Sequence, residues 1–268
     1  TVQEFCNELV KEFEQKIEEL GAENIAAFIA EPVLASGGCI VPPDGYFKKI
    51  YDVCKKNQII FIADEVVTGF GRLGHFFSSE EIFGVVPDII TCAKGITSGY
   101  LPLGAVLFSN KLIADLKDDS SLFFHGYTYS GHPACCAAAL KNIEILKRDK
   151  ILEHVKEIEP YFFEKLNSLY ELPIVGDIRG KGLMAGIECV INKDSKEALV
   201  LDKAIGSRID EESIKLGLII RPLYHICVLS PALIINKEQI NELTEKLYQA
   251  ISNTIDQLKN EGLWSQTK

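Results

Sequence analysis

The 268-residue sequence is 47% hydrophobic and 25% charged, a composition typical of soluble globular proteins and sufficient for a substantial core. Its 28 basic and 38 acidic side chains give a net charge of −10 without any Lys- or Arg-rich block, which argues against nucleic-acid and anionic-membrane partners. No apolar run approaches the roughly 20 residues that cross a bilayer, so we expect a cytoplasmic protein without a membrane span.

The chain begins inside a predicted helix. Apolar side chains recur at helical spacing in its first 20 residues, at Phe5, Leu9, Phe13, Ile17 and Leu20. The first residue is Thr1 rather than a methionine, and nothing there resembles a targeting peptide, so we expect the sequence to be a fragment.

The next hundred residues predict a sheet with parallel strands. Apolar runs of strand length occur at 24–33, 58–67, 87–93 and 101–109. Between the first two runs, 34–45 is a Gly- and Pro-rich loop and 44–57 has helical periodicity. This order is that of a βαβ unit, which predicts parallel strands covered on both faces.

The second half of the chain changes character. A turn-rich segment at 123–133 precedes a long predicted helix at 134–170, broken near Pro160. Two segments that alternate like half-exposed strands and a closing helix follow, at 175–190, 217–235 and 237–260. We therefore predict part of a large α/β domain (1–145), a bridging helix (146–170) and a smaller α+β domain (171–268).

The eight cysteines show no CxxC pair, and most lie in apolar or helical runs. Reduced, buried thiols are therefore expected rather than disulfides or zinc ligands. Since His75, His125 and His132 lack metal-ligand spacing, we predict no metal site.

Ionisable residues follow three of the predicted strands. These residues are Glu31, the pair Asp64 and Glu65, and Lys94. Each alone has a structural explanation, such as a loop anchor, a helix cap or a lysine that reaches solvent. Because the carboxyl ends of parallel strands form the ligand-binding edge of an open sheet, the three together favour a site.

An acid and an amine on neighbouring strands suggest two chemistries. One is a structural ion pair. The other is a pyridoxal-phosphate (PLP) pocket, which needs a lysine for the imine and an aspartate at the pyridinium nitrogen. A lysine at the end of a buried strand is costly unless its charge is paired or chemically consumed, and this cost raises the second possibility for Lys94.

Six motifs occur in an order that resembles the class III aminotransferases of fold type I. They are AAFIAEPVLASGGCIVPPDGYF, IIFIADEVVTGFGRLG, PDIITCAKGITSGYLPLGAV, HGYTYSGHPACCAAAL, DIRGKGLMAGIE and GLIIRP. The resemblance extends from about residue 22 to the end, closest to the ω-amino-acid:pyruvate transaminase branch. It implies a mostly parallel sheet flanked by helices, then a smaller α+β domain, with the N-terminal part of the large domain missing.

The resemblance also implies a role for several residues in binding PLP. Lys94 is implied as the Schiff-base lysine that moves a proton, and Asp64 as the partner of the pyridinium nitrogen. Val66 is implied to press on one face of the ring. Thr128 is implied to donate its hydroxyl to the cofactor phosphate of a neighbouring subunit, with the Tyr127 N–H nearby, so a homodimer or tetramer with shared sites is expected.

Two residues are candidates for binding the substrate. The resemblance implies that Arg221 binds the substrate carboxylate. Without the resemblance, we would expect Arg221 to form an ion pair with an acidic residue at the surface. Glu31 is either its partner when no carboxylate is bound or a loop anchor. Arg179, among glycines in DIRGKG, is expected to form a structural ion pair.

The resemblance predicts an enzyme that moves an amino group from an amine or ω-amino acid to pyruvate. Val67 stands where many class III members have glutamine, which favours this branch, whereas Tyr224 and Ser230 depart from it and leave the substrate open. A 4-aminobutyrate or diamine donor is the alternative within the family. The alternative to an enzyme is a truncated, non-catalytic module for subunit interaction. It is considered because the chain resembles only the last three-fifths of the family's sequence and lacks its phosphate loop.

Overall fold

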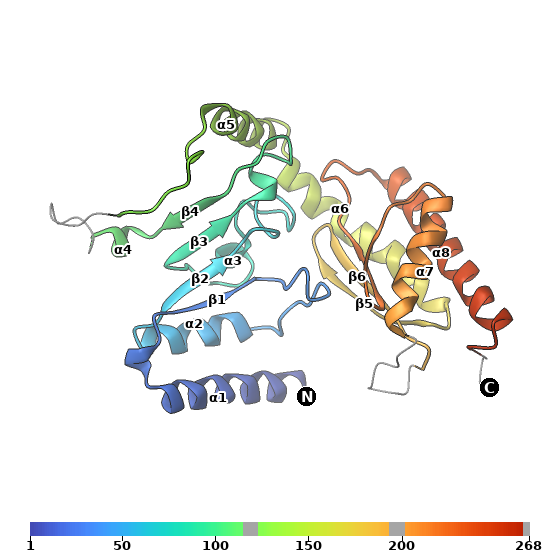
Figure 1. Ribbon diagram of the computed structural model, residues 1–268, viewed down its shortest axis with the longest axis horizontal. Coiled ribbons are helices and arrows are strands. Elements are labelled where there is room, and N and C mark those ends of the chain that lie inside the picture. The colour runs from blue at the N-terminus through green and yellow to red at the C-terminus, as the bar shows by residue number, and fades with distance from the viewer. Residues whose placement is uncertain (115–122, 193–201, 265–268) are drawn as a thin grey trace. The chain divides into compact units, whose positions relative to one another are not determined.

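The computed structural model describes residues 1–114, 123–192 and 202–264 (Figure 1). The chain forms two compact units, each with a four-stranded sheet. The first unit comprises Thr1–Val33 and Pro42–Leu152, and the second comprises Leu34–Val41 and Glu153–Lys268. The loop Leu34–Val41 therefore belongs to the second unit although the residues on both sides of it belong to the first. The domain bounds given above remain a prediction.

The sheet of the first unit has the strand order β1-β2-β3-β4. Its strands are β1 (Ala27–Ala30), β2 (Ile60–Asp64), β3 (Ile89–Cys92) and β4 (Ala105–Phe108). The first three are parallel, which confirms the predicted βαβ unit, whereas β4 runs antiparallel to β3. The connection from β3 to β4 contains no long helix to carry the chain back across the sheet, as a parallel pairing requires.

An aromatic cluster packs this sheet against α1 (Val2–Leu20) and α2 (Tyr46–Lys56). The buried ring of Phe61 on β2 lies 5.6 Å from the Phe28 ring, 5.2 Å from the Phe47 ring and 5.4 Å from the Tyr51 ring, measured between centroids. Burial of several aromatic side chains dominates the energetics of such a core.

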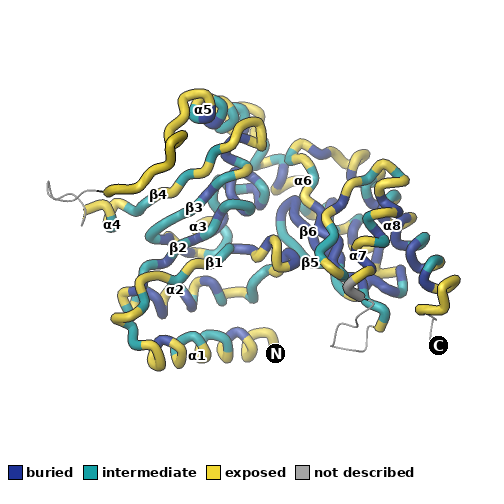
Figure 2. The backbone as a smooth tube through the Cα atoms, in the orientation of Figure 1, coloured by how far each residue is buried: buried dark blue, intermediate teal, exposed yellow. Residues whose placement is uncertain are grey.

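Side chains on the edge strands of this sheet are partly exposed in the residues described. Ile29 on β1 and Val106 on β4 are 58% and 53% exposed, and Figure 2 shows exposed and intermediate segments along these two strands. The aromatic cluster covers one face of the sheet. On β2, Phe61 and Ala63 point to that face and are buried, while their neighbours point to the other face and are half-buried.

The predicted helix 134–170 is two helices, α5 (Pro133–Arg148) and α6 (Ile151–Asn167). The break lies at Lys150, whose φ is +52°, and not at Pro160, which lies inside α6. Proline removes one backbone hydrogen bond. The helix nevertheless continues because its apolar face is buried through Val155, Ile158, Phe162 and Leu166.

Short helical segments connect these elements. They are α3 (Ser78–Glu81), α4 (Asn110–Ala114) and the 3-10 helices η1 (Ala22–Asn24), η2 (Lys94–Ile96) and η3 (Ser168–Glu171). η2 begins at Lys94, one of the predicted site residues.

The second unit has an antiparallel sheet with the order β5-β6-β8-β7. Its strands are β5 (Val175–Lys181), β6 (Met184–Cys189), β7 (Arg221–Leu223) and β8 (Ile226–Leu229). The helices α6, α7 (Asp202–Lys215) and α8 (Lys237–Asn260) share one apolar core with it. In the part of the chain that the structure describes, no helix combines the length and apolarity that a bilayer crossing requires.

Candidate active site

Three predicted site residues lie at one edge of the first sheet. Strands β1, β2 and β3 are parallel, with Ala30 level with Ala63 and Asp64 level with Thr91. Glu31 directly follows β1, Asp64 ends β2, and Lys94 comes two residues after β3. The structure therefore brings an amine and two carboxylates to the carboxyl ends of neighbouring strands, where ligands of open α/β sheets bind.

Asp64 and Glu65 are adjacent carboxylates in different surroundings. Glu65 is fully buried and accepts hydrogen bonds from the Thr68 hydroxyl (2.5 Å), the Ser78 hydroxyl (2.7 Å) and the Ser79 N–H (2.7 Å). Asp64 is half-buried, and its Oδ1 accepts the Val66 N–H at 3.0 Å. Glu65 therefore organises the loop that follows β2, whereas Asp64 has carboxylate oxygen valence left for a ligand.

Lys94 is exposed in the part of the chain that the structure describes. The strand ends at Cys92, and Lys94 begins the 3-10 helix η2 with a φ of +41°. The left-handed backbone conformation is uncommon for a residue with a Cβ and often marks a functional turn. The Lys94 carbonyl accepts hydrogen bonds from the N–H groups of Thr97 and Gly99, each at 3.3 Å, so backbone hydrogen bonds close the turn.

Asn142 on α5 fixes this turn from another helix, a role that the sequence did not predict. Its Nδ2 donates to the carbonyls of Gly95 (2.9 Å) and Ile96 (3.1 Å), and its Oδ1 accepts the Ser98 hydroxyl (2.8 Å). A single asparagine in a helical run carries no pattern that points to such a contact. Asn142 is thus a positioning residue for the segment that carries Lys94.

Replacing Asn142 with alanine is expected to destabilise the protein by about 1 to 3 kcal/mol, because two carbonyls and one hydroxyl lose their partner at a partly buried site. The role predicted for Lys94 implies that turnover falls by roughly tenfold, since small displacements of a catalytic group are costly. Urea denaturation and steady-state kinetics of the full-length protein check both values. Asn24→Ala, which removes one exposed hydrogen bond to Leu20, is the control and is expected to leave turnover unchanged.

The predicted phosphate-binding residues lie in the segment before α5. Thr128 is exposed, and Tyr127 is 79% exposed. The Tyr127 N–H donates to the Ser130 hydroxyl at 2.8 Å, so a phosphate there would have to share or replace this bond. Val66 is half-buried in the turn after β2. The roles given to these residues remain predictions.

The two predicted substrate residues belong to different units. Glu31 is half-buried at the end of β1 in the first unit, and Arg221 is exposed as the first residue of β7 in the second. The predicted ion pair of Arg179 is confirmed, because its Nη1 lies 2.8 Å from the Asp177 carboxylate and 2.6 Å from the Glu188 carboxylate.

The chain has extensive similarity to known transaminases. The family described as Aminotransferase class-III matches residues 1–251. Over 245 residues the chain is 44% identical to a putrescine–pyruvate aminotransferase of Pseudomonas aeruginosa, covering 91% of this chain and 53% of that protein. It is 40% identical over 267 residues to a gamma aminobutyrate transaminase of Solanum lycopersicum, covering 97% of this chain and 51% of that protein.

Solved structures give the same result. An (S)-enantioselective omega-transaminase from Thermomicrobium roseum superimposes with a TM-score of 0.91 at 43% identity, covering 96% of this chain and 57% of that one. An amine transaminase from an uncultivated Pseudomonas species, solved in a PLP-bound form, gives a TM-score of 0.90 at 38% identity, covering 95% and 58%. The chain thus spans about half the length of the curated relatives it matches. It belongs to the class III aminotransferase family, with a mostly parallel sheet in its first unit and an α+β second unit.

Proposed function

We propose that the full-length protein is a PLP-dependent aminotransferase that moves an amino group from an amine or ω-amino acid to pyruvate. The observation that carries this proposal is the placement of Asp64 and Lys94 at the ends of two neighbouring parallel strands. Family membership and the transaminase relatives support it.

The donor set at this sheet edge fits PLP. The cofactor needs a carboxylate at its ring nitrogen and a lysine amine at its aldehyde. Asp64 has oxygen valence left, whereas Glu65 already accepts three hydrogen bonds, so Asp64 is the one of the two suited to the ring nitrogen. Lys94 offers an exposed amine two residues after the next strand. Val66, in the turn between them, suits packing against a ring face.

Each residue has a distinct task in the proposed reaction. When bound, PLP supplies an electron-accepting ring that stabilises negative charge on the substrate carbon. Asp64 keeps the ring nitrogen protonated by accepting its hydrogen bond. The Lys94 amine accepts the proton from the substrate carbon and returns it, a transfer typically worth 10²- to 10⁴-fold in rate. Arg221 orients the substrate carboxylate through two parallel N–H donors.

We also propose a homodimer with shared sites. Its support is the exposed segment before α5, where Phe124 and Tyr127 are 94% and 79% exposed and Thr128 carries the hydroxyl assigned to a neighbouring subunit's phosphate. A cytoplasmic location is proposed as well, supported by the burial of seven of the eight cysteines as thiols.

A diamine donor is the second candidate. The relative from Pseudomonas aeruginosa is named for putrescine and pyruvate, and this name favours a diamine over 4-aminobutyrate, which the plant relative is named for. The two donors differ chemically, since 4-aminobutyrate brings a carboxylate that Arg221 could bind and putrescine does not.

The test uses purified full-length protein with bound PLP. Addition of a donor amine without acceptor is expected to bleach the visible absorption of the cofactor, and pyruvate is expected to restore it with release of alanine. The rates of the first half-reaction with putrescine, 4-aminobutyrate and a panel of aryl amines rank these compounds as amino donors. Replacing pyruvate with 2-oxoglutarate in the second half-reaction tests the preference for the acceptor. A protein that binds PLP but shows neither half-reaction with any pair would overturn the proposal.

A further inference from the structure

The loop Leu34–Val41 belongs to the second unit and lies on one face of its sheet, because Gly38 approaches Arg179, Gly186 and Ile226, whose side-chain positions share that face by the strand register. It approaches three strands. The Gly38 carbonyl accepts the Nε of Arg179 on β5 at 2.9 Å. A Cβ added to Gly186 on β6 would lie 2.9 Å from the same carbonyl oxygen, and one added to Gly38 would lie 2.6 Å from Ile226 Cδ1 on β8. Gly186 is therefore required by the close approach of a backbone oxygen, and Gly38 is favoured by its φ of +114°.

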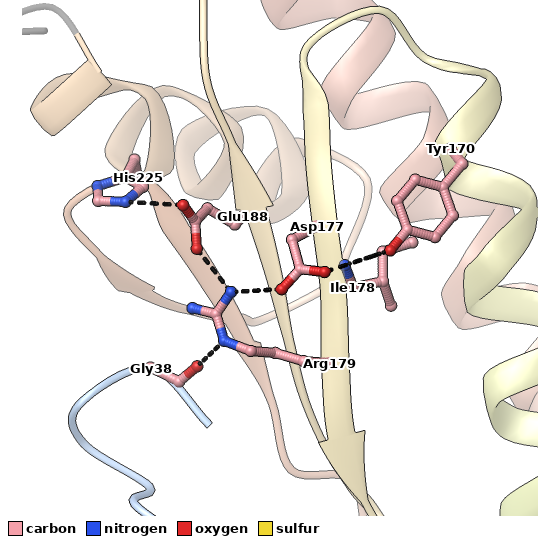
Figure 3. Close-up of polar contacts among 7 residues, drawn as sticks. All are labelled: Gly38, Tyr170, Asp177, Ile178, Arg179, Glu188 and His225. Carbon is pink, nitrogen blue, oxygen red and sulfur yellow. Dashed lines mark hydrogen bonds and ion pairs between the residues drawn. The ribbon is translucent and has the colours of Figure 1, made fainter. Parts of the chain in front are cut away.

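The guanidinium of Arg179 is the polar centre of this contact (Figure 3). While Nε holds the Gly38 carbonyl, Nη1 donates to Asp177 at 2.8 Å and to Glu188 at 2.6 Å. Burial acts to lower the pKa of Arg179, but the hydrogen bonds to Asp177 and Glu188 outweigh it and hold the pKa above its ordinary value. Arg179 is thus a permanent cation with a fixed geometry, and a lysine cannot reproduce its fork.

The same network reaches the hairpin 221–229, which comprises β7, its turn and β8. The second oxygen of Glu188, Oε1, lies 3.5 Å from His225 Nε2, and the Cys189 N–H donates to the His225 carbonyl at 2.8 Å. Glu188 also pairs with Ile226 in the ladder between β6 and β8. Figure 3 shows Glu188 between the Arg179 guanidinium and the His225 ring. His225 lies four residues after Arg221, which begins the hairpin.

We propose that Arg179 is a positioning residue that holds the loop 34–41 and the hairpin 221–229 together on one face of the sheet, and thereby fixes the strand that presents Arg221 to the substrate carboxylate. The last step rests on the function proposed for Arg221 above. The first step is a property of this unit alone and can be measured without turnover.

Buried thiols provide that measurement. Cys39 lies in the loop and Cys227 lies in the hairpin, and both are 0% exposed. Burial raises the pKa of Cys39 to about 11, and a hydrogen bond with Cys189 together with burial raises the pKa of Cys227. Alkylation at either site therefore requires local opening. Cys54 on α2 in the first unit is equally buried, and burial raises its pKa to about 11, so it is a matched internal reference.

The experiment compares Arg179→Gln with wild-type full-length holoenzyme under limiting iodoacetamide, with each cysteine followed by mass spectrometry. Alkylation of Cys39 and Cys227 is expected to accelerate by about tenfold, the effect of losing a hydrogen bond to a charged group, while the Cys54 rate stays constant. Arg208→Gln is the control variant, because Arg208 makes a two-pronged ion pair with Glu261 in the same unit. It is expected to leave the Cys39 rate unchanged.

The kinetic readout separates positioning from simple stabilisation. Arg179→Gln is expected to raise the KM for pyruvate by about tenfold with kcat changed by less than about threefold, because a carboxylate ligand contributes binding in ground and transition states alike. Arg179→Lys, which keeps the charge but not the fork, is expected to give intermediate values for both readouts. If Arg179→Gln fails to fold, Arg179→Lys decides the inference, and unchanged alkylation of both thiols in that variant would overturn it. Gly186→Ala presses on the Gly38 carbonyl and on Cys39, and is expected to accelerate Cys39 alkylation as a positive control for opening of the loop.

The outcomes are distinct. Faster alkylation of Cys39 alone would overturn the inference, because Arg179 would then anchor only the loop. Faster alkylation of both thiols with an unchanged KM, in a protein where Arg221→Ala raises the KM, would overturn it as well. If Arg221→Ala itself leaves the KM unchanged, the role proposed for Arg221 is wrong. The alkylation rates of Cys39 and Cys227 then still decide whether Arg179 holds both the loop and the hairpin in place.

Discussion

Lys94→Ala is expected to lower the turnover of the full-length protein by at least about 10³-fold, because in the proposed reaction Lys94 is both the amine that bonds the cofactor and the group that carries the proton. The free energy of unfolding is expected to change by less than about 0.5 kcal/mol, since the side chain is exposed and alanine has the same Cβ constraint at a φ of +41°. Loss of activity without loss of stability distinguishes a catalytic residue from a structural one.

Steady-state kinetics, the cofactor absorption spectrum and urea denaturation measure these effects. Lys111→Ala on α4 is the control, because it removes another exposed lysine of the same unit and is expected to change none of them. Added ethylamine supplies an amine from solution and is expected to restore part of the turnover of Lys94→Ala. Turnover within tenfold of wild type for Lys94→Ala would refute the assignment of Lys94.

The neighbouring carboxylates Asp64 and Glu65 are expected to respond in opposite ways to substitution. Glu65→Ala leaves two hydroxyls and one backbone N–H without their acceptor in a fully buried site, so a loss of about 3 to 5 kcal/mol in unfolding free energy is expected. Asp64→Asn keeps the volume and the acceptor for the Val66 N–H, and is expected to cost less than about 1 kcal/mol. Its turnover, however, is expected to fall by about 10²-fold or more, because a neutral amide does not keep the ring nitrogen protonated.

Urea denaturation of both variants, with kinetics of the folded fraction, decides this pair of predictions. Glu65→Gln is the matched control for Asp64→Asn, since it makes the same chemical change one residue later. If Glu65→Gln lowers turnover of the folded fraction as strongly as Asp64→Asn, the assignment of Asp64 as the functional carboxylate is wrong.

The elements that the sequence predicted well are those with strong apolar periodicity. Phe61 and Ala63 alternate with half-buried neighbours in β2, and Ile240, Leu247 and Ile251 mark the buried face of α8. In contrast, α7 was not predicted, because its sequence is largely polar, contains a glycine and shows only weak apolar periodicity. The break between α5 and α6 was predicted at Pro160 because the cost of proline is local, whereas the buried face that overrides it depends on the rest of the unit.

The candidate site was predictable only in part. The order of ionisable residues after three strands located Glu31, Asp64 and Lys94 at one sheet edge, since that edge follows from parallel pairing. Which of two adjacent carboxylates is engaged by the protein depends on Ser78 and Ser79, more than ten residues away along the chain. The contact of Asn142 with Gly95 spans 47 residues, and no local pattern encodes it.

The membership of the loop Leu34–Val41 in the second unit has a consequence for biosynthesis. Arg179 follows Gly38 by 141 residues. At a translation rate of about 5 to 20 residues per second, Gly38 is synthesised roughly 7 to 28 s before Arg179. During that interval the first unit can collapse around Phe61, but Cys39 stays available to chaperones and oxidants. Docking of the loop on the second unit's sheet is thus a late step that joins residues far apart in the sequence. We therefore expect slow refolding, with transient modification of Cys39 before the loop docks.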